Sequence, residues 1–80
     1  MEITVYSRTN CQPCKATKRK LGAAGLRFKE ILTDENEEAA EFLRNAGYKE
    51  TPVVRTSEGD EWHGYRPDLI EALADRVFSS

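Results

Sequence analysis

The two cysteines of this chain, Cys11 and Cys14, are the residues best suited to chemistry, because they form a C-x-x-C pair. An apolar run typical of a strand precedes the pair, and a segment with helical spacing follows it. A thiolate, not a thiol, attacks disulfides, and the free amides and dipole of a helix N-terminus stabilise a negatively charged sulfur. The pattern therefore indicates a dithiol–disulfide redox site at the start of a helix.

The spacing of the pair also assigns a role to each sulfur. Cys14 lies three residues after Cys11, so both sulfurs fall on one side of the first turn, within bridging reach. Pro13 suits this turn, where the amides have no intrahelical acceptor to lose. Arg8 and Lys15 add positive charge, which we expect to lower the thiol pKa. We therefore predict that Cys11 attacks and that Cys14, the more buried thiol, resolves the intermediate.

Two other uses of the cysteines stay open. A metal site needs about four ligands, and this chain offers two cysteines and one histidine, His63. A zinc or iron–sulfur site would therefore need Cys11 and Cys14 from two chains, and we expect no metal site within one chain. A purely structural disulfide would close a very small loop, and its loop entropy would stabilise the fold by only about 2 kcal/mol.

Length and composition predict one small domain, residues 1–80, with 39% hydrophobic content and a modest core. A net charge of −2 gives no general electrostatic reason to bind nucleic acid or a membrane. The apolar runs are too short to span a bilayer, and the first strand follows Met1 too closely to leave room for a signal peptide. A redox pair without structural disulfides suits a reducing cytosol, so we expect a cytoplasmic monomer.

The elements that must position the cysteines follow from the hydrophobic spacing. We predict strands at 3–6, 26–32, 53–55 and 61–63, and helices at about 11–24, 34–46 and 67–80. The first strand is expected to be central and the second to lie at an edge. A strand, helix and strand in this order form a parallel βαβ unit, and the last two strands form an antiparallel hairpin. The prediction is an α/β fold of order β-α-β-α-β-β-α, a four-stranded mixed sheet flanked by three helices.

Local signals predict the helix ends. Asp34, with Glu37 three residues later, fits a capping box at the start of the second helix. Gly25 and Gly47 are expected immediately after the first and second helices, and Pro67 at the first position of the third. The stripes expected to face inward are Cys14, Thr17, Leu21 and Ala24; Ala39, Phe42, Leu43 and Ala46; and Leu69, Ile70, Leu73 and Val77.

Thr51 and Pro52 stand immediately before the short valine-rich strand. A later Thr-Pro together with a C-x-x-C pair is more specific than either motif alone, and the combination resembles the thioredoxin-like folds. That resemblance implies that Pro52 is cis and faces the cysteine pair, and that the preceding residue offers its backbone to an extended substrate. The alternative is an ordinary trans proline in a turn.

Over nearly its whole length the chain resembles a glutaredoxin-sized member of the thioredoxin superfamily and, more narrowly, the NrdH-redoxins. The distinguishing stretch is Trp62-His63-Gly64-Tyr65-Arg66-Pro67-Asp68. It is similar to that family's W-S-G-F-R-P-D motif, with His63 in place of the serine and Tyr65 in place of the phenylalanine. Glutathione-using glutaredoxins typically carry Gly-Gly and an acidic pair here, and the bulk of the present side chains should block the close approach that glycines permit.

The resemblance implies a small dithiol–disulfide oxidoreductase that binds no cofactor itself. It implies reduction by thioredoxin reductase, which uses NADPH, and an acceptor that is the large subunit of a class Ib ribonucleotide reductase. Gln12 and Pro13 differ from the C-V-Q-C or C-M-Q-C of the family, and Arg8 stands where glutaredoxins usually have lysine. Two alternatives stay open: a glutathione-dependent glutaredoxin, and a non-catalytic iron–sulfur or zinc carrier.

The candidate site therefore consists of a catalytic pair and a surface that binds substrate or partner. We expect that surface to contain Arg8, Gln12, Pro13, Thr51, Pro52, Trp62, Gly64, Tyr65, Arg66, Pro67 and Asp68. Trp62 has two interpretations, core packing or a docking surface for the reductase. His63 is expected to be an exposed strand residue, and Asp68 to lie in the first turn of the last helix and pair with Arg66. The basic run Lys15, Lys18, Arg19 and Lys20 is either a solvated helix face or a collar that steers an acidic partner.

Overall fold

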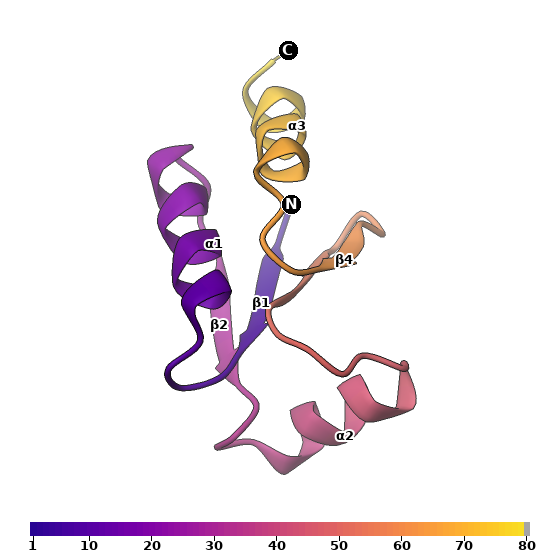
Figure 1. The fold of residues 1–80 in the computed structure, drawn as a ribbon. Coiled ribbons are helices and arrows are strands. Elements are labelled where there is room, and N and C mark those ends of the chain that lie inside the picture. The colour runs from indigo at the N-terminus through magenta and orange to yellow at the C-terminus, as the bar shows by residue number, and fades with distance from the viewer. Residues whose placement is uncertain (80) are drawn as a thin grey trace.

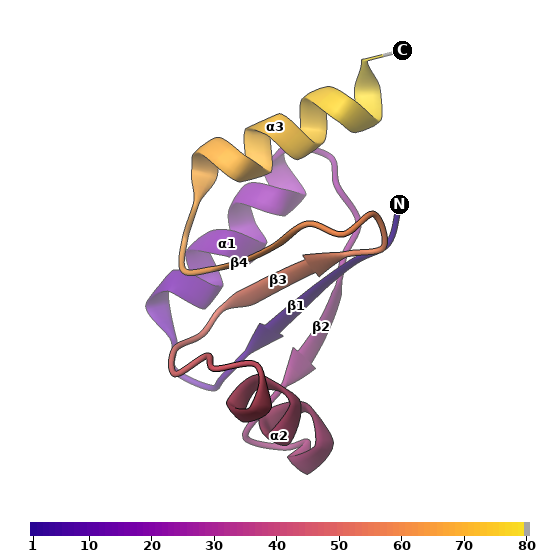
Figure 2. The same ribbon diagram turned by 90° about the vertical axis from the view of Figure 1, so that its right-hand side faces the viewer.

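The chain folds into a four-stranded sheet with helices on both faces, in a computed structural model that describes residues 1–79. The elements are β1 (Ile3–Ser7), α1 (Gln12–Ala23), β2 (Lys29–Leu32), α2 (Glu37–Asn45), β3 (Val53–Thr56), β4 (Glu61–His63) and α3 (Pro67–Phe78). α1 and α3 lie on one side of the sheet and α2 on the other (Figures 1 and 2). The predicted element order and fold class are confirmed. In the described part of the chain, no helix is long and apolar enough to cross a membrane.

β1 is an inner strand because it pairs on both edges. The strand order is β2-β1-β3-β4, with Val5 opposite Glu30 in the parallel pair and opposite Val54 in the antiparallel pair. β3 and β4 form the predicted hairpin, with Val54 opposite Trp62. The sheet is therefore mixed, with β2 at an edge as predicted. Side chains alternate between the two faces along a strand, so Val5 shares one face with the residues two positions before and after it in β1.

The core lies between the sheet and the two helices α1 and α3. Its buried members are Ile3, Val5, Leu21, Leu26, Val54, Trp62, Ile70 and Leu73. The other face carries Phe42 of α2, whose ring lies 5.6 Å from that of Tyr6. The predicted inward stripes are confirmed except at their ends, where Ala46 and Val77 are exposed. Ala46 follows the last residue of α2, and Val77 lies in the last turn of α3, which extends beyond the sheet (Figure 2).

β2 is shorter than the predicted strand at 26–32 because the end of α1 uses the intervening backbone. The Leu26 amide donates to the Leu21 carbonyl, and the Gly25 amide to the Gly22 carbonyl, both at 3.0 Å. These two hydrogen bonds are typical of a helix that ends with a residue in the left-handed conformation. Gly25 is that residue, with a φ of 77°. The Leu26 amide is therefore unavailable to the sheet, and strand pairing begins at Lys29.

The capping box predicted at the start of α2 is wrong. The N-cap is Asn36, whose side chain accepts a hydrogen bond from the Ala39 amide at 3.0 Å. The Asp34 carboxylate instead accepts hydrogen bonds from Thr9, far away in sequence. Glu37 is the first residue of the helix, where its charge complements the dipole as expected.

Arg76 ties α3 to the turn between β3 and β4. Its guanidinium donates to both Asp60 carboxylate oxygens, at 2.9 and 2.8 Å, and to Glu58 at 3.2 Å. The Asp60 carboxylate also accepts the Thr56 hydroxyl at 2.6 Å. The hydrogen bonds from Arg76 and Thr56 hold the pKa of Asp60 well below its usual range.

We expect an Asp60→Asn variant to unfold about 4 °C lower at pH 7, because it loses the charge that Arg76 pairs with. A carboxylate with a lowered folded-state pKa contributes stability above its unfolded pKa, about 3.9, and loses it as the pH falls through the folded value. The deficit of the variant should therefore shrink below about pH 4. Thermal melts followed by circular dichroism from pH 2 to 8 would measure this.

The matched control for this prediction is Arg44→Gln. It breaks the Arg44–Glu37 pair, whose side chains are 61% and 82% exposed, and it should hardly change the melting temperature. An equal loss of stability in Asp60→Asn and Arg44→Gln, or a deficit for Asp60→Asn that is as large at pH 2 as at pH 7, would contradict the predicted role of Asp60.

Candidate active site

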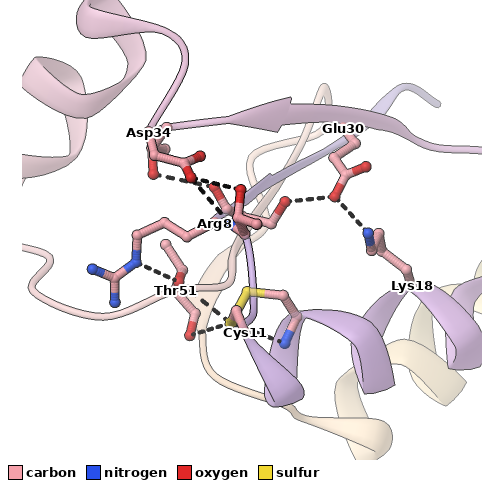
Figure 3. Close-up of a disulfide and its surroundings, with 10 residues drawn as sticks. Arg8, Cys11, Lys18, Glu30, Asp34 and Thr51 are labelled. Carbon is pink, nitrogen blue, oxygen red and sulfur yellow. Dashed lines mark hydrogen bonds and ion pairs between the residues drawn. A yellow bond between two sulfur atoms is a disulfide. The ribbon is translucent and has the colours of Figure 1, made fainter.

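The cysteine pair occupies the N-terminus of α1, as predicted. Cys11 is the N-cap, and its Sγ accepts a hydrogen bond from the Cys14 amide at 3.3 Å. Cys14 is 1% exposed, whereas Cys11 is partly exposed, and the two form a disulfide (Figure 3). Asn10 turns the chain from β1 into α1 with a φ of 59°, a left-handed conformation that asparagine tolerates better than most residues. The turn presents the Cys11 sulfur toward solvent and keeps that of Cys14 inside.

A contact that the sequence did not reveal anchors the loop before Cys11. The Thr9 hydroxyl and amide donate to the Asp34 carboxylate at 2.6 and 3.3 Å (Figure 3). The Thr9 hydroxyl holds the pKa of Asp34 below its usual range, so this carboxylate is charged at neutral pH. The two residues lie 25 positions apart, and no local pattern connects them.

A second polar network joins β1, β2 and α1 close to the disulfide (Figure 3). Glu30 accepts hydrogen bonds at 2.6 Å from Lys18 and from the hydroxyl of Ser7, which is fully buried. Lys18 and Ser7 hold the pKa of Glu30 below its usual range. Lys20, in turn, pairs with Glu71 at 3.0 Å. Two charges of the basic run on α1 are thus paired within the chain, which favours a solvated helix face over a collar.

The segment before β3 contacts the partly exposed sulfur of Cys11. The Thr51–Pro52 peptide bond is cis, as the resemblance implied. The Thr51 carbonyl oxygen lies 3.7 Å and its hydroxyl oxygen 3.5 Å from Cys11 Sγ. Arg8 reaches the same hydroxyl, with its Nε donating at 3.3 Å (Figure 3). Thr51 therefore contacts the reacting sulfur of Cys11, a residue 40 positions away in the chain.

Gly64 brings the stretch 62–68 to the site. Its amide donates to the Pro52 carbonyl at 2.8 Å, and its φ of 83° is one that glycine adopts without strain. Tyr65 follows and is 41% exposed. Arg66 and Asp68 form the predicted ion pair, with two hydrogen bonds of 3.2 and 2.9 Å. Gly64 therefore joins this half of the predicted surface to the cis proline, and none of residues 62–68 lines the pocket at Cys11.

Trp62 belongs to the core. It is 9% exposed and lies opposite Val54 in the hairpin, which confirms the packing interpretation and leaves its ring unable to serve as a docking surface. His63 is exposed as predicted, with its ring 5.9 Å from that of Tyr48. Pro67 opens α3 as predicted.

An open pocket surrounds the exposed sulfur. Among the described residues 1–79, no group of three or more metal-ligating side chains gathers that could hold an ion. The pocket unites five predicted site residues with four that the sequence did not indicate: Arg8, Cys11, Gln12, Pro13 and Thr51 with Thr9, Asn10, Asp34 and Glu50. Asn10, directly before the cysteine pair, is a weak signal in the sequence for the turn. Thr9, Asp34 and Glu50 carry no such signal. A partly exposed sulfur beside the Thr51 backbone and at a helix N-terminus is suited to exchange with an extended peptide that carries a disulfide.

Comparison with known proteins gives consistent matches. A family model for glutaredoxin matches residues 3–59. The glutaredoxin-like protein NrdH of Escherichia coli (strain K12) is 46% identical over 74 residues, which cover 91% of this chain and 89% of that protein. The protein of the same name from Lactococcus lactis subsp. cremoris is 36% identical over 72 residues, 90% of this chain and 99% of its own. A solved structure of NrdH-redoxin from Escherichia coli, described with a thioredoxin-like activity profile, superposes with a TM-score of 0.86 at 44% identity, covering 91% and 95% of the two chains.

Proposed function

Given that this chain belongs to the glutaredoxin family, and within it to the NrdH-redoxins, we propose that it carries electrons from thioredoxin reductase to ribonucleotide reductase. The chain is a thiol–disulfide oxidoreductase, like its relatives. The observation that carries the proposal is the Cys11–Cys14 disulfide at the N-terminus of α1, in contact with Thr51 before a cis proline. We propose that the protein acts in the cytoplasm, where thiols are kept reduced, and as a monomer.

The reaction passes two electrons from the dithiol to a disulfide. The Cys11 thiolate attacks one sulfur of the substrate disulfide; a Cys11–substrate bond forms and the substrate S–S bond breaks, releasing one substrate thiolate. The Cys14 thiol gives its proton to the substrate thiolate just released, and the Cys14 thiolate attacks Cys11 Sγ. The second substrate sulfur leaves as a thiolate, and the Cys11–Cys14 disulfide of Figure 3 is the product. The Cys14 amide, 3.3 Å from Cys11 Sγ, favours the attacking thiolate.

The stretch 62–68 supports thioredoxin reductase rather than glutathione as the electron source. Tyr65 and the paired Arg66 and Asp68 occupy the place where glutathione-using relatives would need small glycines and free acidic groups. The Escherichia coli relative is described as having a thioredoxin-like activity profile. NADPH would then be used only by the reductase, and this chain would need no bound cofactor. The proposed acceptor is the large subunit of a class Ib ribonucleotide reductase.

A coupled assay tests the electron source. We expect NADPH oxidation with a test disulfide to be at least about tenfold faster with thioredoxin reductase than with glutathione and glutathione reductase. That difference is equivalent to about 1.4 kcal/mol in activation free energy. A Cys11→Ser variant should give background rates in both arms. Faster turnover in the glutathione arm would identify a glutathione-dependent glutaredoxin and contradict the proposal. After the expected result, the large subunit of a class Ib ribonucleotide reductase would replace the test disulfide.

A further inference from the structure

The side chain of Thr51 contacts the reacting sulfur. Its hydroxyl oxygen lies 3.5 Å from Cys11 Sγ, and Arg8 Nε donates to the same oxygen at 3.3 Å. Thr51 is 8% exposed, so little water competes for these contacts. The resemblance assigned the backbone of this residue to substrate, whereas the hydroxyl has no role in the mechanism given above.

The direction of these hydrogen bonds follows from the chemistry of the three groups. A guanidinium has donors and no acceptor, so the Arg8 Nε–H donates to Thr51 Oγ1. The hydroxyl has a single proton, which cannot point toward Arg8. A sulfur in a disulfide carries no proton, so Thr51 is the donor in its contact with Cys11. Arg8, Thr51 and Cys11 therefore form a chain in which each group donates to the next.

We propose that the Thr51 hydroxyl, oriented by Arg8, donates a hydrogen bond to the Cys11 thiolate of the reduced protein. This inference deepens the proposed function and rests on it, since it assumes that Cys11 is the attacking sulfur. A hydrogen bond to a charged acceptor is about twice as strong as one between neutral groups, so the contact favours the thiolate over the thiol. Thr51 acts on the reacting atom itself, and Arg8 is a positioning residue that acts through it.

The charges around the sulfur make a short-range donor valuable. The pocket at Cys11 is lined by one cationic side chain, Arg8, and by two carboxylates, Asp34 and Glu50. The carboxylates oppose the field of Arg8 at the sulfur. The groups in direct contact, which are the Cys14 amide at 3.3 Å and the Thr51 hydroxyl at 3.5 Å, are therefore important in stabilising the thiolate.

The test measures the pKa of Cys11 without any partner protein. In a Cys14→Ser background, the rate of iodoacetamide alkylation as a function of pH reports Cys11 alone. We expect Thr51→Val, which keeps the shape and loses the hydroxyl, to raise the pKa of Cys11 by about one unit. Thr51→Ser, which keeps the hydroxyl, should leave it within about 0.3 unit of the parent. An unchanged pKa in Thr51→Val would overturn the inference.

A double-mutant cycle tests the role of Arg8. If Arg8 acts by orienting the hydroxyl, Arg8→Gln should raise the pKa of Cys11 clearly less in the Thr51→Val background than in the parent. Equal effects in both backgrounds would show that Arg8 acts only through its field and would overturn its positioning role. These readouts are independent of the reductase assay. If Thr51→Val leaves the pKa of Cys11 unchanged while the parent protein turns over normally with thioredoxin reductase, this inference alone is refuted. If the pKa shifts as expected but the parent does not turn over with thioredoxin reductase, the proposed electron source alone is refuted.

Discussion

Replacement of Cys14 by serine is expected to stop the reaction at the mixed disulfide between Cys11 and its substrate. Serine keeps the size and the buried position of a residue that is 1% exposed, but its hydroxyl cannot displace a thiolate from a disulfide. Intramolecular attack by Cys14 would have to be replaced by thiols from solution. Because well-placed intramolecular groups have very high effective concentrations, we expect turnover to fall on the order of 10³-fold or more.

The trapped species makes this result specific. Cys14→Ser protein mixed with an oxidised acceptor should give a covalent complex on non-reducing gels, which dithiothreitol reverses and mass spectrometry assigns to Cys11. Cys11→Ser is the matched control and should form no complex, because Cys14 is buried. A complex formed by Cys11→Ser and absent in Cys14→Ser would reverse the roles of the two cysteines.

Truncation of Trp62 to alanine is expected to cost about 3–5 kcal/mol of unfolding free energy, the usual cost of emptying a large aromatic site. The ring is 9% exposed and belongs to the core beside Val54. An 80-residue domain has a total stability of roughly 4–12 kcal/mol, so the variant should lose a large share of its stability. Urea unfolding followed by circular dichroism would measure the loss.

Two variants separate packing from docking in the same stretch of sequence. Within residues 1–79, the indole N–H of Trp62 has no hydrogen-bond partner. Trp62→Phe should therefore cost at most about 1.5 kcal/mol, because it retains an aromatic ring and removes an unpaired donor. Tyr65→Ala, at a position 41% exposed, should change stability by less than about 0.5 kcal/mol and raise the KM for thioredoxin reductase severalfold. Normal stability in Trp62→Ala would contradict the core assignment of its ring.

Much of the fold could be predicted from the sequence because its signals are local. Hydrophobic spacing placed every helix and strand in the correct order. Gly25 and Gly47 follow α1 and α2 as predicted, since a left-handed residue after a helix favours glycine. One error arose where a tertiary contact used a residue that local rules had assigned, and another where the end of a helix did. Asp34 bonds to Thr9 instead of capping α2, and Leu26 remains bonded to the end of α1 instead of starting β2.

The sequence by itself determined the chemistry of the site and the place of its two sulfurs at the start of a helix. A C-x-x-C pair between a strand and a helix lies within a few residues of chain, so its spacing predicts Cys11 at the N-cap, and the apolar stripe that continues from Cys14 along the helix predicts Cys14 inside. The groups that surround the sulfur depend instead on how β1, β2 and β3 pair. Strand pairing brings together residues far apart in the chain, and no local pattern specifies such meetings. Only the tertiary structure could therefore place the Thr51 hydroxyl between Arg8 and Cys11 and bury Trp62 rather than expose it.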